Sequence, residues 1–166
     1  MLSYIVEDFK YLGSYVVSTA HDIDIRLEKA WGALNETDKI WKSELPENLK
    51  RNFFRAIVES VLIYGAITWT LTSSLEKKLD GSYTRMLRAF LNRSWREHPI
   101  NKELYGNIPR LSSTIRQQWL RFDGHCWRNK EELAGDVLLW EPTHGNRKRG
   151  KPMMTYINQL EKDSEY

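Results

Sequence analysis

Asp22 and Asp24 are the carboxylates whose spacing comes closest to that of a metal site, because only Ile23 separates them. Polymerases need paired carboxylates that hold two magnesium ions, and this sequence has no Asp-Asp pair in an aromatic-flanked hairpin. Both residues fall at the start of an expected helix, where the helix dipole stabilises negative charge. We therefore interpret them as first-turn carboxylates, and we expect no catalytic residue in this chain.

His125 and Cys126 are adjacent, which raises the question of a zinc site or a thiol nucleophile. A zinc site needs further ligands, and the other histidines are scattered at His21, His98 and His144. Cys126 also falls on the apolar face of an expected helix, which favours a buried thiol. The sequence has no Gly-rich phosphate loop, Gly-x-Ser-x-Gly elbow or His-Glu-x-x-His motif. We expect neither a metal nor a cofactor.

With catalytic and metal sites not expected, the binding of phosphate by arginines is the chemistry that the sequence still allows. If one helix continues through residues 85–96, four arginines project within about 140° of arc, taking about 100° per residue. These are Arg85, Arg88, Arg93 and Arg96. Few acids are interleaved with them, and guanidinium groups match the geometry of phosphate. The pattern predicts a cationic face that contacts nucleic acid, and a solvated helix surface is the alternative.

A second basic cluster comprises Arg147, Lys148, Arg149 and Lys151. Its glycine-rich surroundings, residues 144–152, predict an exposed loop. Three interpretations fit this cluster: a phosphate-binding arm, a nuclear-import signal and a solubilising loop. We expect the arm to join the arginines of residues 85–96 in binding nucleic acid.

The composition is that of a folded protein. Of the 166 residues, 41% are hydrophobic and 28% are charged, with a formal net charge of +3, unlike a disordered chain. The length is too small for a complete polymerase. No apolar run reaches the ~18 residues of a membrane span and no signal peptide is recognisable, so we expect an intracellular protein, nuclear or cytoplasmic.

Apolar periodicity predicts a mainly α fold with a short N-terminal β-hairpin. The hairpin is expected in residues 3–18, with turn signals at residues 7–8 and 13–14. Helices are expected at residues 19–41, 46–69, 73–90, 101–105, 111–129, 133–140 and 154–162. The second is one helix of about six turns, in which residues 61–64 are apolar nearly all round and therefore expected to be buried.

Helix starts and aromatic residues add further expectations. Thr19 with Asp22, and Ser73 with Glu76, have the spacing of capping boxes. The seven tryptophans are interpreted mainly as core residues, because an indole buries a large apolar area. Stacking on nucleic-acid bases is the alternative.

Five segments, in this order, resemble the C-terminal portion of the endonuclease-reverse transcriptases of non-LTR (LINE-type) retrotransposons. They are Phe9–Ser14 (FKYLGS), Val61–Trp69 (VLIYGAITW), Leu79–Arg88 (LDGSYTRMLR), Gly124–Arg128 (GHCWR) and Arg149–Pro152 (RGKP). The ordered set spans essentially the whole chain, and it is the order and spacing that make the resemblance specific.

The resemblance implies that Tyr11, Leu12 and Gly13 belong to the hairpin that closes the palm and helps to place the primer end. It implies a division into a palm-end hairpin (residues 1–18), a thumb-like helical bundle (19–97), a post-thumb helical region (98–143) and a basic loop with a C-terminal helix (144–166). The thumb would hold the template-primer duplex. The Cys-Cys-His-Cys knuckle of some members is not carried over, because this chain has one cysteine.

These observations predict a C-terminal fragment of an RNA-directed DNA polymerase, which grips nucleic acid without catalytic residues of its own. Its expected partners are an RNA-DNA hybrid or a DNA duplex and the remainder of the polymerase, with no membrane and no small-molecule substrate. One alternative is a helical protein-interaction module. The other is a nonfunctional retroelement relic.

Overall fold

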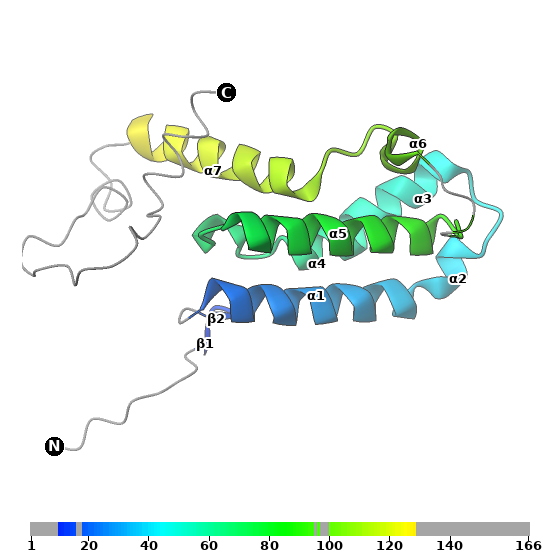
Figure 1. The fold of residues 1–166 in the computed structure, drawn as a ribbon, viewed down its shortest axis with the longest axis horizontal. Coiled ribbons are helices and arrows are strands. Elements are labelled where there is room, and N and C mark those ends of the chain that lie inside the picture. Colours follow the sequence, from blue (N-terminus) through cyan, green and yellow to red (C-terminus); the bar gives the residue numbers. More distant parts are fainter. Residues whose placement is uncertain (1–9, 16–17, 95, 97–99, 129–166) are drawn as a thin grey trace, which may run out of the picture.

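The elements in the computed structural model are mainly α-helical, as the sequence predicts (Figure 1). The structure describes residues 10–15, 18–94, 96 and 100–128. Its elements are β1 (Lys10–Tyr11), β2 (Ser14–Tyr15), α1 (Thr19–Glu36), α2 (Asp38–Trp41), α3 (Glu47–Phe54), a π-helical segment (Arg55–Glu59), α4 (Ser60–Leu62), a 3-10 turn (Ala66–Thr68), α5 (Ser73–Phe90), α6 (Asn101–Tyr105) and α7 (Leu111–Arg128). Every helix in these ranges lacks the length and apolar character of a membrane span.

β1 and β2 form the predicted hairpin, and their register pairs Tyr11 with Ser14. The turn consists of Leu12 and Gly13, which have positive φ angles of 46° and 87°. Two consecutive residues with positive φ make the kind of turn whose twist suits adjacent antiparallel strands. Glycine adopts this conformation freely, whereas Leu12 incurs a steric cost. The turn therefore lies one residue earlier than the sequence indicates.

Both predicted capping boxes are wrong by one residue. Ser18, not Thr19, caps α1, and its hydroxyl accepts a hydrogen bond from a first-turn amide at 3.4 Å. Likewise Thr72, not Ser73, caps α5. In each case the residue in extended conformation just before the helix supplies the cap. Glu76, the expected acidic member of the second box, pairs with α7 instead.

The helix predicted for residues 19–41 is interrupted at Thr37, so α1 and α2 are separate. The Thr37 hydroxyl donates to the Ala33 carbonyl at 2.6 Å, and such a bond competes with the helical ladder. Trp41 then folds back, and its indole Nε1 donates to the Leu34 carbonyl at 2.8 Å. Because this indole is buried, the break allows α2 to contribute to the core.

The six-turn helix predicted for residues 46–69 is wrong as one continuous α-helix. The chain runs through α3, the π-helical segment and α4, and then turns at Gly65. Gly65 has a φ of +76°, which ends the helix in a conformation that glycine favours. Within residues 61–64, Leu62 is fully buried but Tyr64 is 52% exposed, so the expectation of uniform burial is also wrong.

α5 carries the predicted apolar stripe and ends at Phe90. Its buried side chains include Leu79, Tyr83, Leu87 and Phe90. Asn92 then adopts a φ of 52°, and the Arg93 amide donates to the Arg88 carbonyl at 2.9 Å. This hydrogen bond and the positive φ are those of a Schellman C-cap. The helix therefore stops before Arg93 instead of continuing to residue 96.

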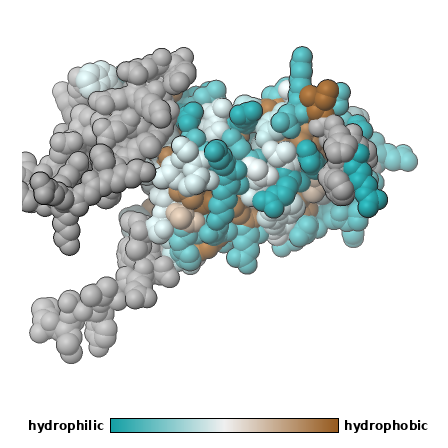
Figure 2. All heavy atoms as spheres, in the orientation of Figure 1, coloured by the Kyte–Doolittle hydropathy of each residue, from teal (hydrophilic) through white to brown (hydrophobic). Residues whose placement is uncertain are grey.

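Most of the described tryptophans are core residues, which confirms their main interpretation. Trp41, Trp69 and Trp119 are buried, and the Trp119 indole donates to the Ala66 carbonyl at 2.8 Å. A buried indole N–H needs such an acceptor. Trp127 is the exception, with 61% of its surface exposed. Figure 2 shows that the visible face is mainly hydrophilic, with small hydrophobic patches between polar side chains.

α6 and α7 lie where the sequence predicts them and are fastened to the preceding helices. The Arg51 guanidinium of α3 donates to the carbonyls of residues 103–105 at 2.9–3.2 Å. The Asp80 carboxylate of α5 accepts from the Ser112 amide and hydroxyl at 3.0 and 2.8 Å. One hydrophobic core contains residues from both sides of the predicted boundary at residue 97. Those on the C-terminal side include Leu104, Ile108, Leu111 and Ile115. The domain boundaries themselves stay predictions.

Candidate nucleic-acid interface

The hairpin is held against the helices by Arg26, a buried residue of α1. Its guanidinium donates to the Gly13 carbonyl at 2.5 Å and to the Ser14 hydroxyl at 3.2 Å. The same group lies over the Tyr64 ring, 4.4 Å from the centroid, in a cation–π contact. The Tyr64 hydroxyl in turn donates to the Leu12 carbonyl at 2.9 Å. The turn of the hairpin is therefore anchored by α1 and by the turn that follows α4.

Asp22 joins the hairpin to α1 and to the segment after α4. Its buried carboxylate accepts from the Tyr15 amide at 3.1 Å and from the Trp69 indole at 2.8 Å. Asp24 is exposed and pairs with Lys78 of α5. The interpretation of Asp22 as a first-turn carboxylate held by the helix dipole is therefore incomplete, because two N–H donors satisfy it in the core.

Two of the segments that carry the resemblance meet at Gly65. A Cβ atom at this position would lie 2.3 Å from the Ser14 Oγ, so the hairpin approaches as closely as glycine allows. Ser14 belongs to the segment of residues 9–14 and Gly65 to the segment of residues 61–69. The structure thus joins two motifs that are far apart in the sequence.

The residues predicted to place the primer end lie at the tip of this hairpin. Tyr11 is 60% exposed and Leu12 is 75% exposed, whereas Gly13 is half-buried. Beside them lies a cavity of about 360 Å³, whose lining includes Tyr11, Leu12, Tyr15, Tyr64 and Trp69. The tip is an exposed apolar and aromatic surface on a fixed backbone.

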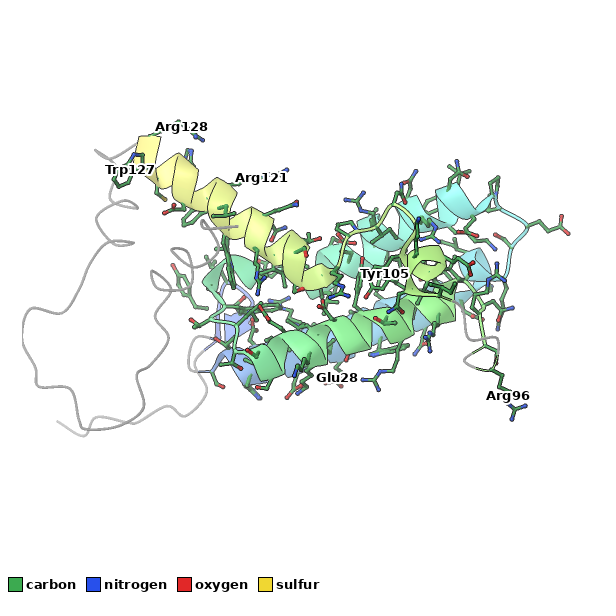
Figure 3. The ribbon with its side chains drawn as sticks, turned by 45° about the horizontal axis from the view of Figure 1, so that its top comes forward. Glu28, Arg96, Tyr105, Arg121, Trp127 and Arg128 are labelled. Carbon is green, nitrogen blue, oxygen red and sulfur yellow. The ribbon has the colours of Figure 1, made fainter. Side chains whose placement is uncertain are left out.

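The four predicted arginines do not form one helical face, because α5 ends before Arg93. Arg85 and Arg88 lie on α5, and Arg85 is exposed while Arg88 is half-buried. Arg93 and Arg96 are exposed beyond the C-terminal end of the helix. Figure 1 places that end beside α2, remote from the hairpin, and Figure 3 shows Arg96 remote from the end of α7. The predicted arm, Arg147, Lys148, Arg149 and Lys151, lies outside the described residues.

A concave surface with several cations adjoins the end of α5. It has a volume of about 370 Å³, and Lys42, Lys50 and Arg93 line it together with Glu47. The Lys50 ammonium donates to the Trp41 carbonyl at 2.7 Å, which fixes its position. Arg93 therefore belongs to a local basic site, although it is separated from the hairpin.

His125 and Cys126, adjacent in the sequence, differ in burial. Cys126 is buried, as expected for a core thiol, whereas His125 faces solvent. The described residues contain no group of three or more His, Cys, Asp or Glu side chains placed to hold a metal. The adjacent residues therefore lie in different surroundings, because neighbours in a helix point about 100° apart.

Known proteins give one informative similarity. An uncharacterized transposon-derived protein of Caenorhabditis elegans is 24% identical to this chain over 170 aligned positions, which cover 95% of the chain and 60% of that protein. The chain thus spans about three-fifths of the length of this relative. No protein family and no solved structure matches the sequence. The similarity supports a transposon origin.

The polar face of α7 carries residues that sequence reasoning missed, because only its apolar positions were considered. The sequence has four such residues at helical spacing: Gln117, Arg121, Gly124 and Arg128. This spacing is the signal from which the polar face could have been predicted. Figure 3 shows Arg121 and Arg128 projecting from the same side of α7, away from α5. Among the described residues, neither arginine has an ion-pair partner. This face is therefore a second cationic surface of the described chain.

Proposed function

We propose that the chain is the thumb and post-thumb part of a retroelement RNA-directed DNA polymerase, which grips a template-primer duplex without catalytic residues of its own. The proposal rests on the docking of the hairpin at Gly65, where two segments of the sequence resemblance form one structural unit. The transposon-derived relative supports a transposon origin.

The hairpin supplies a fixed surface for one end of the duplex. Arg26 and Asp22 hold its backbone from α1, and this backbone carries the exposed side chains of Tyr11 and Leu12. Such a surface can contact the last base pair of a primer, because aromatic and apolar side chains stack on bases without regard to sequence. This contact would position the primer end for a catalytic palm elsewhere in the polymerase.

The arginines supply contacts to the phosphates. Arg85 and Arg88 lie on the second half of α5, about 4.5 Å apart along the axis at ~1.5 Å per helical residue, and Arg93 and Arg96 lie beyond the end of the helix. Contacts to phosphate position a duplex but read little sequence. Polymerisation requires this kind of sequence-independent grip.

The experiment compares DNA duplexes that end in a recessed 3′ primer with blunt duplexes. The wild-type chain should prefer the recessed end, and Tyr11→Ala/Leu12→Ala should weaken that binding about fivefold or more, because a stacking contact contributes ~1 kcal/mol or more. The matched control is Ile100→Ala/Leu120→Ala, which removes exposed apolar side chains elsewhere. Equal losses in both variants, or primer extension by the chain alone, would contradict the proposal.

A protein-interaction module is a second candidate, favoured by one observation. Leu49 and Phe53 lie one turn apart on α3, and each is 41% exposed. An apolar pair on one helical face fits a groove on a partner protein. This reading predicts that neither duplex binds appreciably and that Leu49→Ala/Phe53→Ala abolishes association with that partner. The relic reading predicts instead that the purified chain shows no cooperative thermal unfolding.

A further inference from the structure

An open groove lies between α7 and the segment that follows α4. It has a volume of about 520 Å³, which is within the range of small organic-molecule sites, about 300–1,000 Å³. Its lining combines the apolar Ile63, Ile67 and Phe122 with the polar Gln118, Arg121 and His125. The groove therefore combines apolar side chains with polar and basic ones.

Two arginines dominate the charge beside this groove. Arg121 lines it, and Arg128 lies two turns further along the same side of α7 (Figure 3), about 10 Å away along the helix axis. Asp123 is the one acid in the sequence of α7. A ligand with an apolar ring and repeated negative charges would complement this surface.

We propose that this groove binds single-stranded nucleic acid, with one unpaired base against Phe122 and neighbouring phosphates on Arg121 and Arg128. Only an unpaired base can leave the stack and enter an apolar groove, whereas a duplex presents its phosphates and hides the faces of its bases. The Gln118 amide can donate to and accept from a base edge. RNA and DNA strands share this chemistry.

The position of the groove relates it to the hairpin. Gly65 lines both the groove and the cavity beside the hairpin tip, so the two sites flank one turn of the chain. A strand that leaves a duplex at the hairpin would therefore reach α7 by crossing the Gly65 turn. This route, unlike the groove itself, rests on the proposed function.

The first test measures the binding of labelled uridine and thymidine homo-oligomers of about 20 nucleotides to the full chain over a range of salt concentrations. Arg121→Gln/Arg128→Gln should lower the slope of log K against log salt by about 1.4 units, because each phosphate contact to a single strand contributes about 0.7. The control Lys29→Gln/Lys39→Gln removes two exposed charges on α1 and α2 and should leave the slope unchanged. Equal changes in the two variants would overturn the inference.

The second test separates base binding from charge. Phe122→Leu keeps the apolar bulk but removes the ring, so oligomer affinity should fall about threefold or more through loss of stacking. Affinity for a blunt duplex should not change, and a thermal melt of the variant checks its fold. Unchanged affinity for both oligomers would overturn the inference. A difference between the uridine and thymidine oligomers would identify RNA or DNA as the preferred strand while supporting it.

The same measurements keep this inference separate from the proposed function. Duplex binding without oligomer binding would contradict the inference about the groove and would not contradict the proposed function. Oligomer binding that depends on Arg121 and Phe122, without any duplex binding, would support the groove and contradict the proposed function.

Discussion

Arg26 illustrates how one buried side chain organises the candidate interface. A buried guanidinium is costly unless it is paired and hydrogen-bonded. Here Asp22 lies 3.9 Å from its Nε, the Gly13 carbonyl accepts from its terminal nitrogen, and the Tyr64 ring covers its face. A shift of the hairpin would therefore remove the Gly13 and Ser14 acceptors from this buried guanidinium.

The contact at Gly65 gives a prediction at the level of single atoms. Gly65→Ala should lower the free energy of unfolding by about 2 kcal/mol or more, since it combines a residue with positive φ and a clash with Ser14. Ser14→Ala/Gly65→Ala should recover part of this loss, because the clashing atom is the Ser14 hydroxyl. Chemical denaturation of the four proteins in this cycle measures the coupling, and simple additivity would contradict the predicted contact.

Tyr83 and Glu59 form a buried polar pair that gives a second prediction. Burial, reinforced by the neighbouring Glu59 carboxylate, raises the pKa of Tyr83 above its ordinary value, so the hydroxyl remains a donor to Glu59 at 2.5 Å. Tyr83→Phe should cost about 1–3 kcal/mol of stability, because it leaves a buried carboxylate without this donor. Tyr105→Phe, which removes a less buried hydroxyl bonded to Thr84, should cost less. A larger loss for Tyr105→Phe would contradict this ranking.

The helices show which features of the fold are local and which depend on tertiary contacts. Apolar periodicity located α5 and α7 because their buried faces repeat at helical spacing, whereas α6, with one buried residue, was expected from the prolines on either side of it. It failed at helix ends, which depend on the cap that the folded chain selects, as with Ser18 and Thr72. It failed also over residues 85–96, where Asn92 ends α5 by adopting positive φ.

The candidate interface was predictable only in part for the same reason. The tip residues Tyr11 and Leu12 follow from the resemblance of one short segment. Their anchors are Arg26 and Tyr64, of which Tyr64 lies 52 residues from Leu12 in the sequence, and no local pattern relates them. Arg121 and Arg128 could have been predicted from their spacing alone. The sequence of this helix was interpreted only through its apolar residues, which predict a contact with the core.

Core positions on α5 and α7 give a prediction for these elements. Leu87→Ala and Trp119→Ala should each lower stability by about 2–5 kcal/mol, because both side chains are fully buried. The control is Leu120→Ala, at the residue after Trp119, which is 38% exposed and should cost about 0.5 kcal/mol or less. Urea denaturation measures all three, and small losses at the two core positions would show that the buried faces are misassigned.

At the scale of the whole molecule, the basic arm provides a test of duplex binding. Replacing Arg147, Lys148, Arg149 and Lys151 by alanine removes up to four phosphate contacts. The slope of log K against log salt for duplex DNA should then shrink by roughly 3–4 units. Fluorescence anisotropy at several salt concentrations measures this slope. An unchanged slope would exclude the arm from the binding surface, and a nuclear-import signal would instead show mislocalisation in cells with duplex affinity intact.

The Arg51 contact to α6 has a consequence for how the molecule opens. A helix of five residues does not persist alone, and α6 has its last carbonyls bound by a guanidinium that belongs to α3, more than 50 residues earlier. Fluctuations that expose the amides of α6 should therefore be tied to those of α3 and not to those of its sequence neighbour α7. Native-state hydrogen exchange would then report α3 and α6 as one cooperative unit, and Arg51→Gln would divide that unit in two.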